Sequence, residues 1–257
     1  MPDDLLWKIP FEALPDWDLA SHFNVTYATS LATLAVQRRL PPPQGSAPSA
    51  AIVAAPSILP AVWAQLLLSE PGWKEPDSAA TTAAAQKIAG AYGDRATVRT
   101  GADASESAVR AALETVDVAE IAAPFHVSGA SPLFSSVLLA GAGEQAESDG
   151  RWEAREWFGI DGRARVLVIP DASGFGAPGV GDAMDVLAWA AASAGVSALV
   201  FGRWPGDLFS PDAVATGFHA QLAAGAAPAD AWQAAVAAVR HKDTRPALWA
   251  GLRFIGG

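Results

Sequence analysis

Two polar side chains follow an apolar run in the second half of the chain, and they are the first candidates for chemistry. Val166–Ile169 is an unbroken β-branched and leucine run, which predicts a strand buried on both faces. The run stops at Pro170, and the glycine-rich loop that follows carries Asp171 and Ser173. Loops at the carboxyl ends of such strands hold the chemistry of α/β folds. The chain contains no cysteine, which excludes a thiolate nucleophile, a disulfide and a thiolate metal site.

Ser173 could act as the nucleophile of a hydrolase, with His126 as the plausible base. Serine hydrolases place their nucleophile on a sharp turn framed as Gly-x-Ser-x-Gly. The five residues centred on Ser173 read DASGF and lack the first glycine. A loop serine that bonds to the backbone is therefore the favoured interpretation. Hydrolysis by Ser173 with His126, or with Asp171 as an acid, remains an alternative.

Gly174 opens the sequence GFGAPG at residues 174–179, which matches the Gly-x-Gly-x-x-Gly turn of dinucleotide-binding proteins. Four residues separate the strand from the first glycine, and Asp182 would place negative charge at the phosphate end. The next strand is followed by Arg203, where such proteins carry an acidic residue. We interpret the match as chance and keep nucleotide binding at residues 174–179 as a second alternative.

Metal or cofactor binding has little support in the sequence. None of the four histidines has metal-ligand spacing to another, and a strand histidine bonded to backbone is the favoured interpretation of His126. Asp171, Asp182 and Asp185 could gather a divalent cation. However, the start of a helix explains the last two, with Asp182 as its expected N-cap. We therefore expect no metal and no cofactor.

Alternating strands and helices must position these residues. We expect strands at residues 5–9, 25–28, 51–54, 96–99, 118–126, 136–140, 166–169 and 198–201, with an edge strand at 248–255. We expect helices at residues 30–39, 61–68, 79–92, 105–116, 151–158, 182–195, 211–224 and 228–240. This alternation predicts an α/β fold with a mostly parallel sheet and helices on both faces.

The order of motifs in residues 163–204 resembles the CHAT domain, a family of caspase- and separase-like peptidases. Gly174, Gly176, Asp182, Gly195 and Trp204 fall into the spacing of that family without a gap. In this register the position of the catalytic cysteine is occupied by Asp171. A shift by one residue would place Ala172 there, and neither residue is a thiol.

The resemblance extends over nearly the whole chain. Residues 6–14 (LWKIPFEAL), 25–31 (VTYATSL) and 245–257 are similar to the terminal motifs of the family. Residues 121–139 (IAAPFHVSGASPLFSSVLL) are similar to its histidine segment. In that match His126 is the first, structural histidine, Ala130 occupies the position of the catalytic histidine, and Ser131 replaces the glycine that follows it.

The resemblance implies a caspase-like three-layer sandwich in which both members of the catalytic dyad are replaced. It further implies an inactive pseudopeptidase that serves as a binding or regulatory module, possessing no catalytic residue of the family type. The expected partner is an active peptidase, a repeat protein or a peptide segment, in a bacterial conflict or defence system. Family members bind an extended peptide beside the dyad, often with a basic residue in an acidic pocket. We expect Asp171, Ser173, Gly174 and Trp204 to contribute to binding.

Composition sets the remaining limits. The 257 residues, 51% hydrophobic and 17% charged, can form a sizeable core, and we expect a single domain at 1–257. Within it, residues 1–45 would form an amino-terminal module packed on a main sheet at 51–257. The net charge of −10 argues against nucleic-acid binding. The sequence start lacks the pattern of a signal peptide, and the uncharged residues 186–202 are short for a membrane span. We therefore expect a cytoplasmic protein that binds neither nucleic acid nor membranes.

Overall fold

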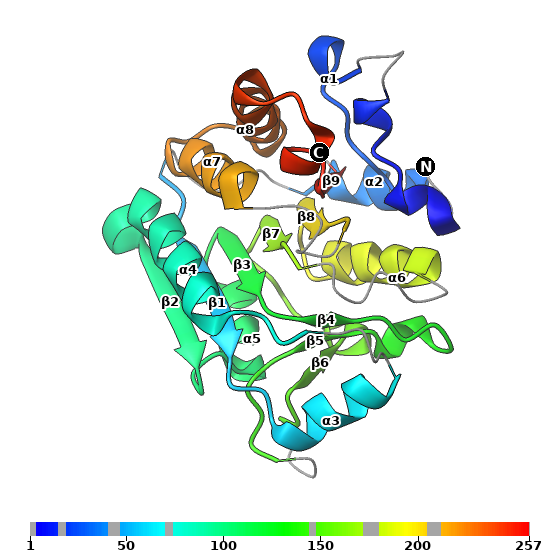
Figure 1. Cartoon of the computed structure of the whole chain (residues 1–257), viewed down its shortest axis with the longest axis vertical. Helices are drawn as coiled ribbons and strands as arrows, with labels where there is room; N and C mark the ends of the chain where they lie inside the picture. The colour runs from blue at the N-terminus through cyan, green and yellow to red at the C-terminus, as the bar shows by residue number, and fades with distance from the viewer. Residues whose placement is uncertain are drawn as a thin grey trace.

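A central sheet of six strands organises the chain (Figure 1). The computed structural model describes residues 4–14, 19–40, 47–69, 74–143, 148–171, 180–204 and 212–256. In spatial order the strands are β2 (Ala96–Gly101), β1 (Ala50–Pro56), β3 (Val118–Ala122), β7 (Val166–Ile169), β8 (Ala198–Gly202) and β9 (Leu252–Gly256). All neighbouring pairs are parallel except β8 and β9, which are antiparallel at one edge.

Helices cover both faces of this sheet. One face packs against α4 (Ser78–Tyr92), α7 (Asp212–Ala223) and α8 (Pro228–Lys242). The other face packs against α5 (Glu106–Thr115) and α6 (Val180–Ser193). Alternate residues of β3 point to opposite faces, because side chains alternate along a strand. The predicted α/β three-layer architecture with a mostly parallel sheet is thereby confirmed.

A second, antiparallel sheet lies beside the first. It consists of β4 (Phe125–His126), β5 (Ser136–Leu138) and β6 (Arg151–Glu153), with α3 (Pro60–Ser69) packed on Leu138. The predicted continuous strand at 118–126 is wrong, since the chain leaves the central sheet after Ala122. Proline has no backbone N–H, so Pro124 cannot extend the central ladder as a donor, and its carbonyl instead accepts from Leu138.

The expected helix at 151–158 is also corrected. Its first part is β6, and only Ala154–Glu156 form a short 3-10 helix, η5. Trp152 is buried, and its ring stacks on Trp157 with centroids 4.3 Å apart. Residues 151–153 are extended because they pair with β5, where Trp152 lies opposite Val137. Another 3-10 helix, η4 (Pro132–Phe134), precedes β5.

The amino-terminal segment covers the β9 edge of the central sheet. The backbone N–H of Tyr27 donates to the carbonyl of Phe254, and the backbone N–H of Gly256 donates to the carbonyl of Tyr27. These two bonds use backbone groups of β9 that would otherwise be unpaired at the edge of the sheet. Residues 4–8 form a 3-10 helix, η1 (Asp4–Lys8), so the strand expected at 5–9 is wrong. Three further elements complete this segment: η2 (Phe11–Ala13), α1 (Leu19–His22) and α2 (Leu31–Gln37).

Ser30, Asp77 and Ser105 begin α2, α4 and α5, and each accepts backbone N–H groups of the first turn. The short 3-10 helices η3 (Gly93–Arg95) and η7 (Pro246–Leu248) precede β2 and β9. None of the helices in the described ranges combines the length and apolar composition that crossing a membrane requires.

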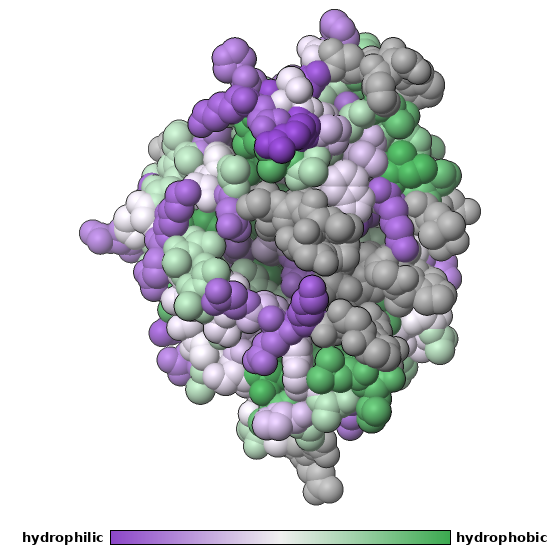
Figure 2. All heavy atoms as spheres, viewed as in Figure 1, coloured by the Kyte–Doolittle hydropathy of each residue, from purple (hydrophilic) through white to green (hydrophobic). Residues whose placement is uncertain are grey.

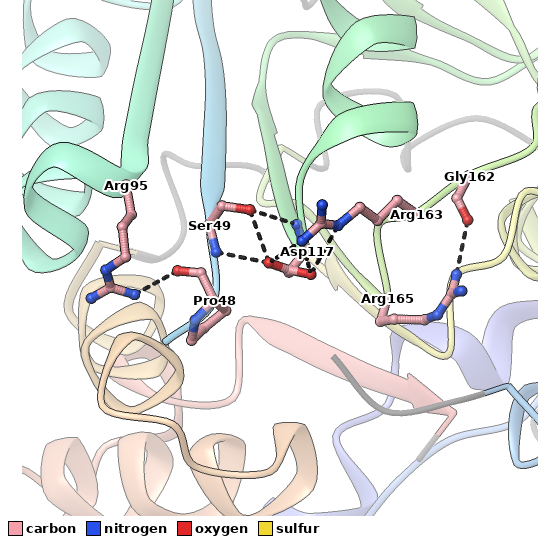
Figure 3. Close-up of polar contacts among 7 residues, drawn as sticks. All are labelled: Pro48, Ser49, Arg95, Asp117, Gly162, Arg163 and Arg165. Atoms are coloured by element: carbon pink, nitrogen blue, oxygen red, sulfur yellow. Dashed lines mark hydrogen bonds and ion pairs between the residues drawn. The ribbon is translucent and has the colours of Figure 1, made fainter. Parts of the chain in front are cut away.

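A polar cluster ties together the amino ends of three adjacent strands (Figure 3). Asp117, which precedes β3, accepts hydrogen bonds from the backbone N–H and hydroxyl of Ser49, which precedes β1. The guanidinium of Arg163, before β7, donates to the same carboxylate at 3.2 Å. Burial acts to raise the pKa of Asp117, but the hydrogen bonds from Ser49 and Arg163 outweigh it and hold the pKa below its usual value. The cluster therefore holds the amino ends of β1, β3 and β7 together.

Candidate functional site

A cavity of about 210 Å³ opens at the carboxyl ends of β1, β3 and β7. Pro56 lines it from the end of β1 and Ala122 from the end of β3. The residues that follow the strands also line it, namely Ala123 and Pro124 after β3 and Asp171 after β7. Parallel strands bring their carboxyl ends to one edge of a sheet, and α/β folds bind ligands there. The cavity lies where the sequence placed the candidate site.

The end of β1 is strained where it borders the cavity. Ala55 adopts φ 47, a left-handed conformation that residues other than glycine rarely take, and the β1–β2 register shifts at the same point. Strained backbone of this kind concentrates at ligand sites, because only the surrounding structure maintains it. The strain is a second local feature that distinguishes this edge of the sheet.

The cavity combines apolar walls with negative charge. Its walls include Ile58 and residues of α4 and α7, among them Ala84, Ile88 and Ala215. The charged residues that line it are Glu75, Glu120, Asp171 and Asp212. Among the described lining residues there is no Lys, Arg or His. The cavity therefore favours a ligand with an apolar body and a cationic group.

Glu120 is the deepest of these carboxylates, and the sequence analysis missed it. It lies in the middle of β3 on the face toward α4 and α7, and it is only 3% exposed. His219 of α7 is fully buried beside it, with Nε2 2.6 Å from Glu120 Oε2. The only local signal was an acidic residue inside the apolar run that formed β3. No spacing rule links that residue to a histidine in another helix.

Tyr92 of α4 completes this buried network. Its hydroxyl lies 2.9 Å from His219 Nδ1. Burial, followed by the negative charge of Glu120, raises the pKa of Tyr92 well above its usual value, so the phenol stays protonated. We assign the phenol as the donor to Nδ1, so that the other ring nitrogen, Nε2, is the one in contact with Glu120. The network presents Glu120 to the cavity in a fixed orientation.

Only one of the two predicted dyad positions, Asp171 and Ala130, lines this cavity. Asp171 lines it and is half-buried. Ala130 lies exposed in a bend after β4 and is not a lining residue. The assignment of the catalytic cysteine position to Asp171, with Ala172 as the alternative, stays a prediction. Residues 172–179, with Ser173, Gly174 and the proposed nucleotide-binding turn, lie outside the described residues.

His126 belongs to the small sheet rather than to the cavity. It pairs with Ser136 across β4 and β5, and burial together with Arg151 lowers its pKa. Trp204 is half-buried, and its indole N–H donates to the carbonyl of Lys8 at 3.1 Å. Neither residue lines the cavity. His126 is therefore not brought together with Asp171 in that lining, and Trp204 anchors the amino-terminal segment.

The helix after the glycine-rich loop begins earlier than predicted. Helix α6 starts at Val180, so Asp182 is in its first turn and the expected N-cap assignment is wrong. Asp182 is exposed there, where its charge suits the positive end of the helix dipole. The helix ends at Ser193, two residues before the predicted end, and Gly195 follows it with φ 90, a conformation that favours glycine. Within the described ranges, no three His, Asp or Glu side chains converge as metal ligands.

These features define a caspase-like α/β protein with its candidate site at the carboxyl ends of the parallel strands. The structure is similar to that of separase from Saccharomyces cerevisiae, solved as a separase–securin complex, with a TM-score of 0.54 and 13% sequence identity. The alignment covers 98% of this chain and 15% of the separase chain, so the likeness concerns the fold of one part of a much longer protein.

The model of the CHAT domain family matches residues 1–257, and the chain therefore belongs to the CHAT domain family. The family match confirms the resemblance deduced from the sequence motifs. No curated protein matches the chain significantly.

Proposed function

We propose that this chain is a catalytically inactive CHAT domain that binds a protein or peptide segment at the cavity without cleaving it. The observation that carries the proposal is the lining of the cavity, which offers carboxylates and apolar groups where a peptidase needs a thiolate and a base. Asp171 is no substitute for a thiolate nucleophile. Ala130, which the sequence match places at the position of the base, cannot accept a proton.

The ligand proposed for this cavity is a basic side chain of an extended partner segment. Glu75 and Asp212 are exposed at the cavity, and Asp171 is half-buried within it. A net charge of −10 on the whole chain adds long-range attraction for a basic partner. Capture should therefore weaken as salt screens these charges.

Two measurements test this function. Fluorogenic peptide mixtures incubated with the purified chain should remain uncleaved, and cleavage that persists on repurification would contradict the proposal. Fluorescence anisotropy should then detect binding of labelled peptides that carry one basic residue, with norleucine at the same position as the reference.

Asp171→Asn should weaken this binding about threefold to tenfold at low salt, because it removes one nearby charge. Asp94→Asn is the matched control, since Asp94 lies exposed in η3 at the amino end of β2, on the opposite edge of the sheet. Equal affinities for the wild-type chain and Asp171→Asn would remove Asp171 from the proposed site.

A further inference from the structure

The cavity contains one carboxylate whose two oxygens are not equivalent. Glu120 Oε2 lies 2.6 Å from His219 Nε2, and both side chains are buried. Within the described ranges Glu120 Oε1 makes no hydrogen bond. Because Glu120 lines the cavity, Oε1 is the oxygen left to accept from a ligand. Only one of the two acceptor atoms is therefore available.

The surroundings prevent the carboxylate from turning to offer both oxygens. Glu120 sits in a central strand between Ile52 and Val168, its neighbours across the ladders. The His219 ring is fully buried and packs edge-on against Tyr92 and Phe218, with centroids 5.8 and 6.0 Å away. Swinging Glu120 away from His219 would separate two buried polar groups that lie in contact, and no water could replace either partner there.

A single available oxygen discriminates between the two basic side chains of proteins. Guanidinium groups bind carboxylates best through two parallel N–H donors, which need both carboxylate oxygens. An ammonium group is a compact point charge that one oxygen satisfies. The apolar walls formed by Ala84, Ile88 and Ala215 suit the methylene stem that carries such a group.

We propose that the cavity selects a primary ammonium group on an aliphatic stem over a guanidinium group, with Glu120 as the specificity-determining acceptor held by His219. In a partner segment this group is a lysine side chain. The assignment rests on the proposed function of the cavity and adds its ligand class. Glu120 binds and selects in this role, and no covalent step is involved.

Titrations of the unaltered chain with small ions test the selectivity directly. Thermal unfolding is followed at constant ionic strength in increasing n-butylammonium, n-propylguanidinium or 1-butanol, which represent the lysine side chain, the arginine side chain and an uncharged analogue. Because a ligand that binds only the folded state raises the melting temperature, each titration yields an apparent Kd. The ammonium ion should bind about tenfold more tightly than the guanidinium ion. Equal binding, or tighter binding of the guanidinium ion, would overturn the proposal.

Variants then locate the selectivity. Glu120→Gln should abolish the preference between the two ions, whereas Asp171→Asn should weaken both ions to a similar extent and keep the preference. A preference that persists in folded Glu120→Gln would overturn the assignment. If that variant does not fold, the titrations of the unaltered chain still decide the proposal.

Labelled peptides that differ only in one Lys or Arg separate this inference from the proposed function. Binding of both peptides with equal affinity sustains the binding function and overturns the lysine selectivity. Absence of peptide binding alongside selective binding of n-butylammonium overturns the peptide-binding function and sustains the ammonium site.

Discussion

Pro124 and Asp171 line one cavity from the carboxyl ends of two adjacent parallel strands, β3 and β7. Reactive groups of α/β enzymes meet at such an edge. Here one of the two residues has no titratable side chain, and the other is a carboxylate in a chain without cysteine. This edge of the sheet has a cavity and a strained backbone at Ala55. It does not have the thiolate and base that a thiol peptidase requires. The cavity can therefore be tested through its shape and its negative charge.

A single cysteine introduced at Asp171 should report the negative field of the cavity. The chain has no other thiol, so labelling of Asp171→Cys is unambiguous. The thiolate displaces sulfinate from a methanethiosulfonate and forms a mixed disulfide. Because Glu75, Glu120 and Asp212 also line the cavity, cationic aminoethyl methanethiosulfonate should react at least about tenfold faster than the anionic sulfonatoethyl reagent at low salt.

Asp94→Cys serves as the control for this labelling, because Asp94 is exposed at the opposite edge of the sheet. The ratio of the two labelling rates should be much smaller there. The ratio at Asp171→Cys should also fall as salt is added, since exposed charges are screened over about 8–10 Å. A salt-independent ratio, or one equal to that of the control, would contradict an acidic cavity.

The cluster around Asp117 should stabilise the fold and make its stability depend on pH. Removing the buried carboxylate in Asp117→Ala leaves Ser49 without an acceptor and Arg163 without its partner, which should lower the free energy of unfolding by about 2–4 kcal/mol. The pKa of Asp117 is lowered in the folded state, so its contribution is present above the unfolded pKa of about 4 and is lost as pH falls through the folded pKa.

Urea unfolding at pH 7 and at pH 3 measures this contribution. The difference between the wild-type chain and Asp117→Asn should be large at pH 7 and smaller at pH 3, where the wild-type carboxyl is protonated for more of the time. Asp243→Asn provides the matched control, because Asp243 forms an exposed ion pair with Arg245 and its loss should leave the unfolding midpoint nearly unchanged. A pH-independent effect at Asp117 would contradict the linkage.

Local patterns were sufficient for most of the fold. Ser105 and Asp77 cap helices because their oxygens satisfy backbone N–H groups near them in sequence, and the apolar run at β7 needs no distant information. The break between β3 and β4 was missed because two strands of different sheets are separated only by Ala123 and Pro124. The apolar pattern continues across that break. Only the pairing of β4 with β5 reveals it.

The candidate site was predictable in position but not in composition. Asp171, which lines the cavity, was predicted as a site residue because it follows a buried strand, a relationship that is local in sequence, and its role there stays a prediction. The buried network joins residues of three separate elements: Glu120 of β3, His219 of α7 and Tyr92 of α4. In the sequence, none of them has a feature that sets it apart from other polar residues. Their contact depends on which helix faces which strand. That choice is made by packing, and no spacing along the chain encodes it.

The ion pair between Glu12 and Arg203 is buried, and removing one partner should therefore destabilise the fold strongly. Arg203 donates to Glu12 at 3.0 Å, lies over the Tyr27 ring and has no solvent exposure of its side chain. Arg253 is also fully buried nearby, and burial followed by the charge of Arg203 lowers the pKa of Arg253 well below its usual value. Glu12→Gln should therefore leave the buried Arg203 without the carboxylate that it donates to, and lower the free energy of unfolding by about 3–5 kcal/mol.

The double variant Glu12→Gln with Arg203→Met should unfold less easily than Glu12→Gln alone, because it also removes the uncompensated charge. Chemical denaturation of the wild-type chain and the three variants completes the double-mutant cycle. If the double variant loses the sum of the two single effects, the pair is not coupled and the argument from burial is wrong.

Two glycine positions should respond in opposite directions to the same substitution. A Cβ atom built on Gly162 would lie 1.9 Å from the carbonyl oxygen of Ala194, at the end of α6, so Gly162→Ala must displace backbone. Arg165 bridges the same two segments by donating to the carbonyls of Gly162 and Gly195, and that bridge would be disturbed as well. Gly162→Ala should lower the free energy of unfolding by at least about 2 kcal/mol.

Gly90 is the matched position, since it lies exposed within α4 and a Cβ there meets no atom within 4 Å. Alanine loses less conformational entropy than glycine when a helix forms, so Gly90→Ala should raise the free energy of unfolding by about 0.5–1 kcal/mol. Urea titrations of both variants at one pH make the comparison. Gly162→Ala with unchanged stability would mean that the loop before β7 does not approach α6 as closely as the structure has it, and the hydrogen bonds of Arg165 would then lose their basis.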